Sequence, residues 1–348
     1  MSMSVVTGVT RTPVARSRRR VQVVVGLVLL GALAVSVLLS LAFGSRPIPF
    51  REVLDAVFTD LDSDNATVIE SQRVPRTLLG LSAGVALGMA GALMQGHTRN
   101  PLADPGLFGV NAGASFGVAV LVFTLDVTTP ASLTAAALIG AGVVTTLVFV
   151  LGLGGRQGGG LVMLAVVGTT LGALLAAFTT ALVLLDRQTL DVMRFWEVGA
   201  LSNRDLSLVP IMLPLVVLGL LLAVMNAFTL DALSLGDDVA ESLGTDVRTS
   251  RVTGIVAISL LAGTATAVCG PIGFVGLVAP HLARALSGHD YRWLVPFSGL
   301  AGGALLLLAD TAGRLVARPG ELQAGIVLAV VGAPVLLGLT RRRRLVSL

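Results

Sequence analysis

Apolar residues occur along this chain in long runs that short polar or Pro/Gly-rich segments separate. A helix needs about 20 mostly apolar residues to cross the hydrocarbon core of a bilayer. The pattern therefore predicts an all-α polytopic membrane protein of about ten transmembrane helices. The predicted spans lie near residues 21–43, 77–95, 106–125, 131–154, 161–185, 206–230, 252–269, 272–286, 293–309 and 322–340.

Arginine clusters at both ends of the sequence predict where the termini lie. Residues 1–20 end in the letters SRRR, and TRRRR follows the last apolar run. Basic flanks favour the cytoplasmic side of a membrane, so we expect both termini to be cytoplasmic. The first run, Val21 to Phe43, is too long for the core of a cleaved signal peptide, and we interpret it as a retained helix. The expected organisation is a basic tail (1–20), one transmembrane domain (21–340) with a cytoplasmic loop at about 231–250, and a second basic tail (341–348).

Glycine and proline mark two places where helices pack closely or break. Gly80, Gly84, Gly88 and Gly91 recur every three or four residues, which places them on one helix face and favours tight helix packing. The apolar stretch 252–286 is too long for one straight helix and too short for two helices with an ordinary loop. It contains the letters GPIG, so we expect a broken helix or a tight hairpin whose backbone is buried against protein.

Three polar segments between the apolar runs carry further structure. The segment Pro47–Glu70 has an amphipathic pattern followed by an acidic turn, which predicts a short helix on the outer surface. The loop Gly96–Gly106 contains two prolines that prevent a continuous helix. In the loop Leu233–Arg251, Val239 and Leu243 lie one helical turn apart after two acidic residues. A short inner helix with such an apolar face predicts contact with another protein.

Composition narrows the chemistry that this chain can perform. Of its 348 residues 54% are hydrophobic and 13% are charged, and all 24 cationic side chains are arginine. Without lysine it has no phosphate-binding loop of the GKS or GKT form, so we expect no ATP hydrolysis. No catalytic constellation is evident either, so we expect no other enzymatic activity. The arginines flank apolar runs instead of forming a basic face, which argues against nucleic-acid binding. The single cysteine, Cys269, is expected to be a packing residue.

Neither a metal site nor an internal ion relay is expected. The three histidines have no partners at a metal-ligand spacing. Ion-coupled carriers need ionisable groups near the bilayer midplane, whereas the predicted spans keep nearly all their charges at their ends. A pore-forming chain of this kind has to take its energy from a partner.

Long ordered segments of this sequence are similar to one known family. The segment Arg73–Gly117, which begins RVPRTLLGLSAG and contains TRNPLADPG, resembles the signature of the FecCD family. These proteins are the permeases of ABC importers for iron-siderophore complexes, haem and vitamin B12. The segment Gly270–Leu315 and the loop LSLGDDVAESLG agree, so the resemblance covers nearly the whole chain after residue 45. It implies the fold of the vitamin B12 permease, a type II importer subunit.

The resemblance also implies partners and a location. A second permease subunit, identical or related, would pair with this chain among the lipids of a bacterial plasma membrane. Two cytoplasmic ATPases would bind ATP and Mg, so no cofactor is expected on this chain. A substrate-binding protein would dock on the extracytoplasmic side.

Three arginines match a docking site of the family. Arg73, Arg76 and Arg314 correspond to the outer arginines that receive glutamates of the binding protein in the vitamin B12 permease. Arginine suits this role because its planar fork grips a carboxylate with two hydrogen bonds. Ordinary anchoring at the membrane interface is the alternative for Arg73 and Arg76. Arg318 has no matched role.

The resemblance also carries over a cytoplasmic gate and an ATPase-coupling helix. Asn100 and Leu102 match a turn that helps to close the pathway, with a packing turn as the alternative. Gly159 and Gly160 fall near a second gate segment, although the family member has small hydroxyl residues there. The inner helix matches the loop that docks on the ATPase, and lying on the lipid surface is its alternative. Its expected coupling residues are Gly236, Val239, Ala240, Leu243 and Gly244.

The expected function is therefore import of a substrate by a permease that partner ATPases drive. The stretches MRFWEVGALSNRDL and VARPGELQ look most similar to permeases of the ferric-enterobactin type, which favours a ferric siderophore as substrate. Haem and vitamin B12 are the alternatives within the family. An ion-coupled secondary transporter and a non-transporting membrane scaffold are the alternatives from other classes.

Overall fold

Helices make up all the regular structure in the part of the chain that the computed structural model describes, residues 13–44, 48–49, 52, 64–153, 160–202 and 206–341. Ten helices within these ranges have at least 13 residues, which confirms the predicted class. Seven helical segments are long and apolar enough to cross a bilayer, while α5 and α14 are shorter apolar helices. The ten are α1 (Pro13–Ala42), α4 (Val74–Thr98), α5 (Val110–Leu125), α6 (Pro130–Leu153), α7 (Gly160–Leu185), α9 (Val209–Ser234), α11 (Val247–Cys269), α12 (Val275–Ser287), α13 (Tyr291–Val316) and α14 (Ala324–Arg341).

Short helical elements connect or extend these ten. One of them, α8, was not predicted, because residues 186–205 lie between two predicted spans. Asp186 begins it by accepting a hydrogen bond from the backbone N–H of Thr189, and Thr189, Met193 and Trp196 form its buried stripe. The short elements are α3 (Asp64–Val68), η1 (Ile69–Arg73), η2 (Pro105–Phe108), α8 (Arg187–Trp196), η3 (Leu206–Leu208) and α10 (Asp237–Ser242).

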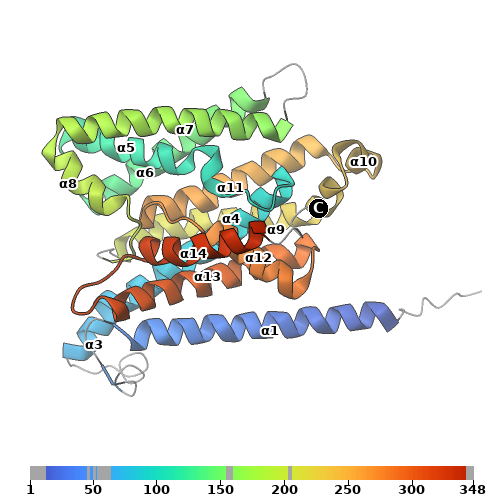
Figure 1. The fold of residues 1–348 in the computed structure, drawn as a ribbon, viewed down its shortest axis with the longest axis horizontal. Coiled ribbons are helices and arrows are strands. Elements are labelled where there is room, and N and C mark those ends of the chain that lie inside the picture. Colours follow the sequence, from blue (N-terminus) through green and yellow to red (C-terminus); the bar gives the residue numbers. More distant parts are fainter. Residues whose placement is uncertain are drawn as a thin grey trace, which may run out of the picture.

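Helix α4 lies at the centre of the bundle and packs against α9, α11, α12 and α13 (Figure 1). The predicted glycine face makes this close approach possible. A Cβ atom on Gly84 would lie 2.6 Å from the carbonyl oxygen of Gly302, and one on Gly91 would lie 1.9 Å from that of Gly276. Backbones that approach so closely leave no space for a methyl group, so the prediction of tight packing is confirmed.

The helix that contains α4 begins earlier than predicted. The sequence placed the start of this span near residue 77, but α3, η1 and α4 follow one another without a break from Asp64 to Thr98. Pro75 cannot donate a backbone hydrogen bond, and the wider turns of the π-helical segment η1 precede it. Most of the predicted surface helix in 47–70 lies outside the described residues.

The apolar stretch 252–286 forms the broken helix that the sequence predicted. Helix α11 ends at Cys269 and α12 begins at Val275. The backbone N–H of Ala200 donates a 2.8 Å hydrogen bond to the carbonyl oxygen of Cys269, so protein satisfies this freed backbone group. The break requires glycine at position 270. Its φ is 76°, and a Cβ atom there would lie 2.2 Å from the carbonyl oxygen of Trp196.

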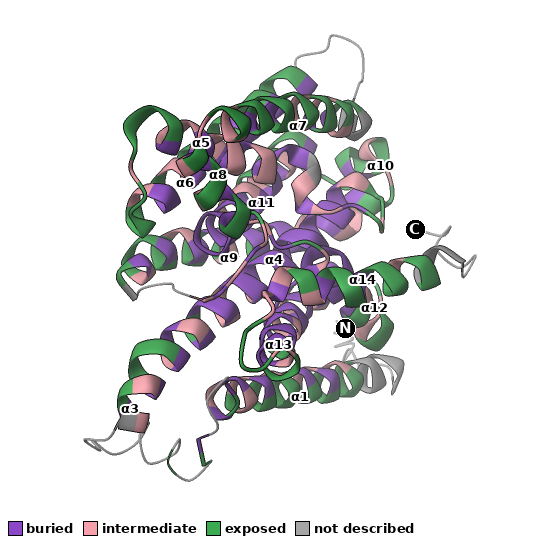
Figure 2. Ribbon diagram, turned by 60° about the vertical axis from the view of Figure 1, so that its left-hand side comes forward, coloured by how far each residue is buried: buried purple, intermediate pink, exposed green. Residues whose placement is uncertain are grey.

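The distribution of exposed apolar side chains is that of a protein surrounded by lipid. In α4, α11 and α13 between 72% and 78% of the most apolar window is buried, whereas α1, α6, α7 and α9 bury only 17% to 33% of theirs. Figure 2 shows the same division, with buried residues on α4 and α13 and exposed ones along α1 and α7. Water would not tolerate so much exposed hydrocarbon, whereas the interior of a bilayer does.

Candidate docking, gate and coupling sites

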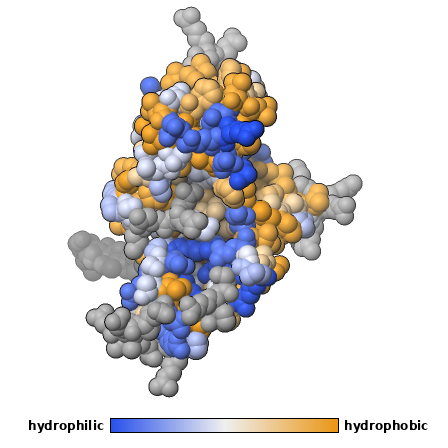
Figure 3. Space-filling model, turned by 90° about the vertical axis from the view of Figure 1, so that its left-hand side faces the viewer, coloured by the Kyte–Doolittle hydropathy of each residue, from blue (hydrophilic) through white to orange (hydrophobic). Residues whose placement is uncertain are grey.

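The three arginines predicted to dock a binding protein meet at one end of the bundle, beside α3 at the left of Figure 1, which we call the arginine end. Arg73 ends η1, Arg76 lies in the first turn of α4, and Arg314 lies in the last turn of α13. Because α13 runs back along α4, residues far apart in the sequence become neighbours. Figure 3 views this end directly and shows hydrophilic surface gathered on it between hydrophobic flanks.

A buried carboxylate organises this cluster. The Arg76 guanidinium grips Asp310 with two hydrogen bonds, Nε to Oδ2 at 2.9 Å and Nη2 to Oδ1 at 2.8 Å, and donates a third to Glu321 at 2.7 Å. Arg314 also pairs with Asp310, at 3.2 Å, and Asp310 is completely buried. Asp310 was not among the predicted site residues. Its signal was a lone acidic residue in an apolar run, four residues before Arg314.

The other two guanidinium groups hold the end of α1. Arg73 donates from Nη1 to the carbonyl oxygens of Leu41, at 2.7 Å, and Ala42, at 2.8 Å. Arg314 donates from Nη1 to the carbonyl oxygen of Phe43 at 2.7 Å. The last carbonyl groups of a helix have no partners within the helix, so these arginines act as a cap that ties α1 to α4 and α13.

The three arginines differ in how accessible their side chains are to a partner protein. The exposed fraction is 4% for Arg73 and 2% for Arg314, so both face into the protein. Arg76 keeps a side-chain exposure of 12%, and its contact with Glu321 is open to water. Arg318 is exposed and donates to the carbonyl oxygen of Gly44 at 2.8 Å. Docking of a partner by the first three stays a prediction.

The predicted gate turn directly follows α4. The Asn100 side-chain oxygen accepts a 3.0 Å hydrogen bond from the backbone N–H of Leu102, which makes a compact turn. Asp104 then caps η2 by accepting from the backbone N–H of Gly106 at 2.9 Å, while burial raises the pKa of the Asp104 carboxyl. Element η2 packs against α7, whose first residue is Gly160. Gly159 lies outside the described residues.

The predicted coupling loop forms the short helix α10, at the end of the bundle opposite the arginine end (Figure 1). Val239 and Leu243 are 44% and 64% exposed, so the apolar pair is on the surface, whereas Ala240 is fully buried beneath them. Gly236 and Gly244 bound the helix with φ of 112° and 82°, values that favour glycine. The contact of this surface with an ATPase stays a prediction.

A buried polar network lies inside the bundle near its α10 end. His97 of α4 is 2.7 Å from the side-chain oxygen of Asn226 on α9. Asn226 donates to the Ser250 carbonyl oxygen on α11 at 2.7 Å, which fixes its oxygen as the acceptor for the His97 Nε2–H. Gly254 is needed beside them, because a Cβ atom there would overlap the His97 ring. The network joins three helices and holds no metal-binding cluster within the described residues.

A bundle of apolar helices around a glycine-packed central helix, with a broken helix against it and polar sites at both ends, defines a polytopic membrane protein. Comparison with known proteins identifies the family to which this membrane protein belongs. Residues 32–342 match the FecCD transport family. The chain belongs to the FecCD transport family, and it is a multi-pass protein of the bacterial inner membrane.

Individual relatives cover nearly the whole chain. The ferric enterobactin transport system permease protein FepD of Escherichia coli (strain K12) is 44% identical, over 91% of this chain and 94% of its own. The Fe(3+)-citrate import system permease protein YfmD of Bacillus subtilis (strain 168) is 38% identical, over 88% and 91%. A solved inward-facing metal-chelate type ABC transporter has a TM-score of 0.81 and 26% identity, over 91% of this chain and 98% of that chain.

Proposed function

We propose that this chain is the membrane-spanning subunit of an ABC importer that carries a ferric siderophore across the cytoplasmic membrane. The observation that carries the proposal is the 44% identity with the ferric enterobactin permease over almost the full length of both chains. The structural similarity to a metal-chelate type ABC transporter supports it. The chain itself changes no bond in this account, and ATP and Mg bind to partner ATPases.

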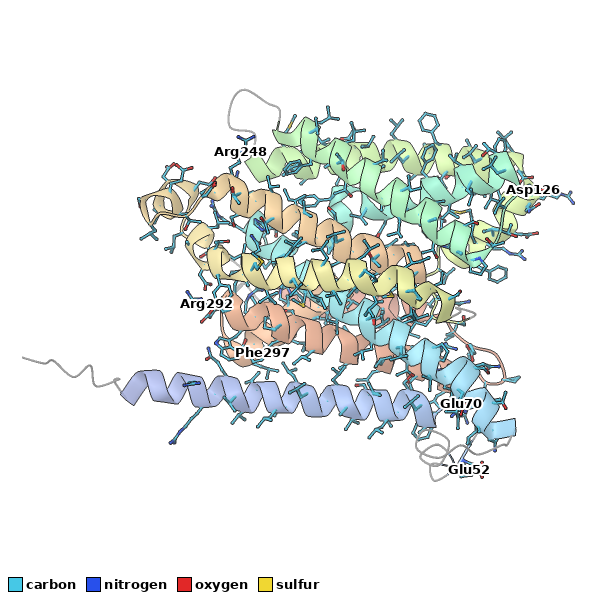
Figure 4. The ribbon with its side chains drawn as sticks, turned by 180° about the vertical axis from the view of Figure 1, so that it is seen from behind. Glu52, Glu70, Asp126, Arg248, Arg292 and Phe297 are labelled. Atoms are coloured by element: carbon cyan, nitrogen blue, oxygen red, sulfur yellow. The ribbon has the colours of Figure 1, made fainter. Side chains whose placement is uncertain are left out.

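The α10 end faces the cytoplasm in this proposal. In Figure 4, Arg248 and Arg292 lie at the α10 end, whereas Glu52, Glu70 and Asp126 lie at the arginine end. Clusters of positive residues favour the cytoplasmic side, and the basic segments SRRR and TRRRR lie at the start of α1 and the end of α14, which supports the orientation. Helix α1 begins and α14 ends at the α10 end (Figure 1). In the proposed orientation both termini are therefore cytoplasmic.

Each end then has one kind of partner. The exposed Val239 and Leu243 contact a cytoplasmic ATPase, and the arginine end receives carboxylates of a substrate-binding protein. A second permease subunit, identical or related, completes the pathway. The turn at Asn100 and Leu102 closes the cytoplasmic side, with the segment at Gly159 and Gly160 as the second part of the gate.

Transport by the reconstituted complex tests the function. Proteoliposomes that contain the permease, its ATPase and its binding protein should take up ⁵⁵Fe-enterobactin when ATP is enclosed with the ATPase. Uptake should stop with a non-hydrolysable ATP analogue and continue when a protonophore collapses the proton gradient. Uptake that needs the gradient and not ATP would refute the proposal, and exclusive uptake of haem or cobalamin would reassign its substrate.

Docking can be tested separately, because a second arginine at the same end of the bundle provides a control for Arg76. Arg194 on α8 is a 56% exposed arginine paired with Asp191 (3.3 Å). Arg76→Gln should weaken binding of the binding protein at low salt by about tenfold or more, since losing one partner of a desolvated charge pair costs about 2 kcal/mol or more. Arg194→Gln should change it little. Equal binding by both variants would remove the docking role and leave the transport proposal intact.

A further inference from the structure

One carboxylate at the α10 end connects three elements that the proposed function needs to move together. Asp237 is the first residue of α10. Its Oδ1 accepts a 2.5 Å hydrogen bond from Nη2 of Arg99, and its Oδ2 pairs with Nη2 of Arg251. Arg99 directly follows the last residue of α4, and Arg251 lies in the first turns of α11. Each oxygen of a single side chain is therefore bound by a different helix.

The first of these links leads to the gate turn. Arg99 has left-handed backbone geometry, with φ of 48°, and directly precedes Asn100. Its Nε also donates to the carbonyl oxygen of Leu233, at the end of α9, at 2.9 Å. A guanidinium held at two points has little freedom to rotate, so a displacement of Asp237 would shift the backbone at the start of the gate turn.

The second link leads to the broken helix. The Arg251 side chain is only 17% exposed, and α11 continues from it to Cys269, where the chain breaks before α12. Helix α11 also packs against α4. Movement of α10 that pulls on Arg251 would therefore act on the helix that precedes the break.

The backbone on both sides of α10 contains a glycine in an open position. Gly236 and Gly244 bound the helix, and a Cβ atom at either position would meet nothing within 4 Å. Glycine at positive φ in open space is a compliant connection. The buried Ala240 and the two ion pairs of Asp237 add side-chain contacts that fix α10 on the bundle.

We propose that Asp237 is the positioning residue that couples α10 to the gate turn and to α11, through its paired contacts with Arg99 and Arg251. This inference rests on the proposed function, because it assumes that an ATPase moves α10. The partial exposure of the three side chains makes these ion pairs weak contributors to stability. Their effect is on geometry, since the two oxygens fix α10 relative to two helices at once.

The neighbouring residue provides a matched control. Asp238 lies in the same turn of α10 and is exposed, and it forms no ion pair with any residue in the described part of the chain. Asp237→Asn and Asp238→Asn remove the same charge and nearly the same shape. A difference between them therefore reports the contacts of Asp237 and not the net charge of α10.

The test measures ferric siderophore transported per ATP hydrolysed, in proteoliposomes with the ATPase and the binding protein. Asp237→Asn should still co-purify with the ATPase, yet its transport per ATP should fall by about fivefold or more, the lower range of typical coupling free energies. Asp238→Asn should match the wild type. Arg99→Gln should reproduce the loss, and Asp237→Asn with Arg99→Gln should lose no more than the stronger single variant.

Three results would overturn the inference. Equal transport per ATP in the two aspartate variants would show that the ion pairs do not couple α10 to the gate. Loss of ATPase co-purification in Asp237→Asn alone would place the residue in the docking surface. Additive losses for Asp237→Asn and Arg99→Gln would show that the two residues act independently. A wild-type complex without ATP-driven uptake would instead refute the proposed function.

Discussion

Replacement of Asp310 by asparagine tests whether the arginine end is held together by its buried carboxylate. The variant keeps the shape of the side chain but removes the charge that faces Arg76 and Arg314. Losing one partner of a buried ion pair costs about 3–5 kcal/mol, because the remaining charge is left without compensation. Asp310 is completely buried, so its loss should be costly. Arg76 keeps its contact with Glu321, which partly compensates its charge. We therefore expect the free energy of unfolding to fall by about 3 kcal/mol, the lower end of that range.

Glu321 provides the control for this experiment. Its side chain is 31% exposed and makes a single contact with the same guanidinium, so Glu321→Gln should cost less than about 1 kcal/mol. Removing Arg76 together with Asp310 should cost less than the sum of the two single changes, because the pair is lost only once.

The chain contains its own reporter for this comparison. Cys269, the single cysteine of the sequence, is completely buried, so a thiol-reactive fluorophore labels it only after the bundle opens on heating in detergent. Asp310→Asn should lower the labelling midpoint clearly more than Glu321→Gln does. Equal midpoints for these two variants would refute the view that the buried carboxylate holds α4 and α13 together.

Two further predictions concern helix packing and helix capping. Gly91→Ala should destabilise the bundle by about 1–3 kcal/mol in the same labelling assay, since its methyl group would overlap the backbone of α12. Gly142→Ala, at a site with nothing within 4 Å, should be neutral or stabilising by roughly 0.5–1 kcal/mol, and the reverse order would contradict the packing argument. Hydrogen bonds from Thr189 lower the pKa of Asp186, so its capping of α8 is complete above the ordinary value of 3.8 and is lost as pH falls towards the lowered value. Asp186→Ala should raise amide hydrogen exchange in the first turn of α8 at pH 7, and no increase would contradict the capping role.

Local patterns in the sequence predicted the features that depend on local chemistry. Apolar runs long enough for a bilayer gave the all-α class, and glycines every three or four residues gave the packed face of α4. The letters GPIG gave the broken helix between Cys269 and Val275, because glycine and proline interrupt a helix wherever they occur. The apolar pair Val239 and Leu243 is exposed on α10 as its spacing predicted.

The features that were missed depend on contacts between distant segments. Arg76 and Asp310 are 234 residues apart, so nothing near either residue indicates that they pair. Docking of another protein by the three arginines stays a prediction, but their contacts within the chain, with a carboxylate and with helix carbonyl groups, were not predicted. Helix α8 was missed because its buried stripe falls in a polar connection, where neither a long apolar run nor glycine marked it.

Helix α4 explains how the two polar ends can act on one another. Arg76 lies in its first turn and Arg99 directly follows its last residue, so the two are about 35 Å apart at 1.5 Å per residue. Gly84 and Gly91 hold this helix against α13 and α12 at backbone contact, which leaves it no space to bend independently. A force on Arg76 from outside and a force on Arg99 from α10 therefore act on the same rigid body. In the proposed complex, signals from the two predicted partners would not need a chain of side chains across the membrane, because a displacement of this one helix would carry both.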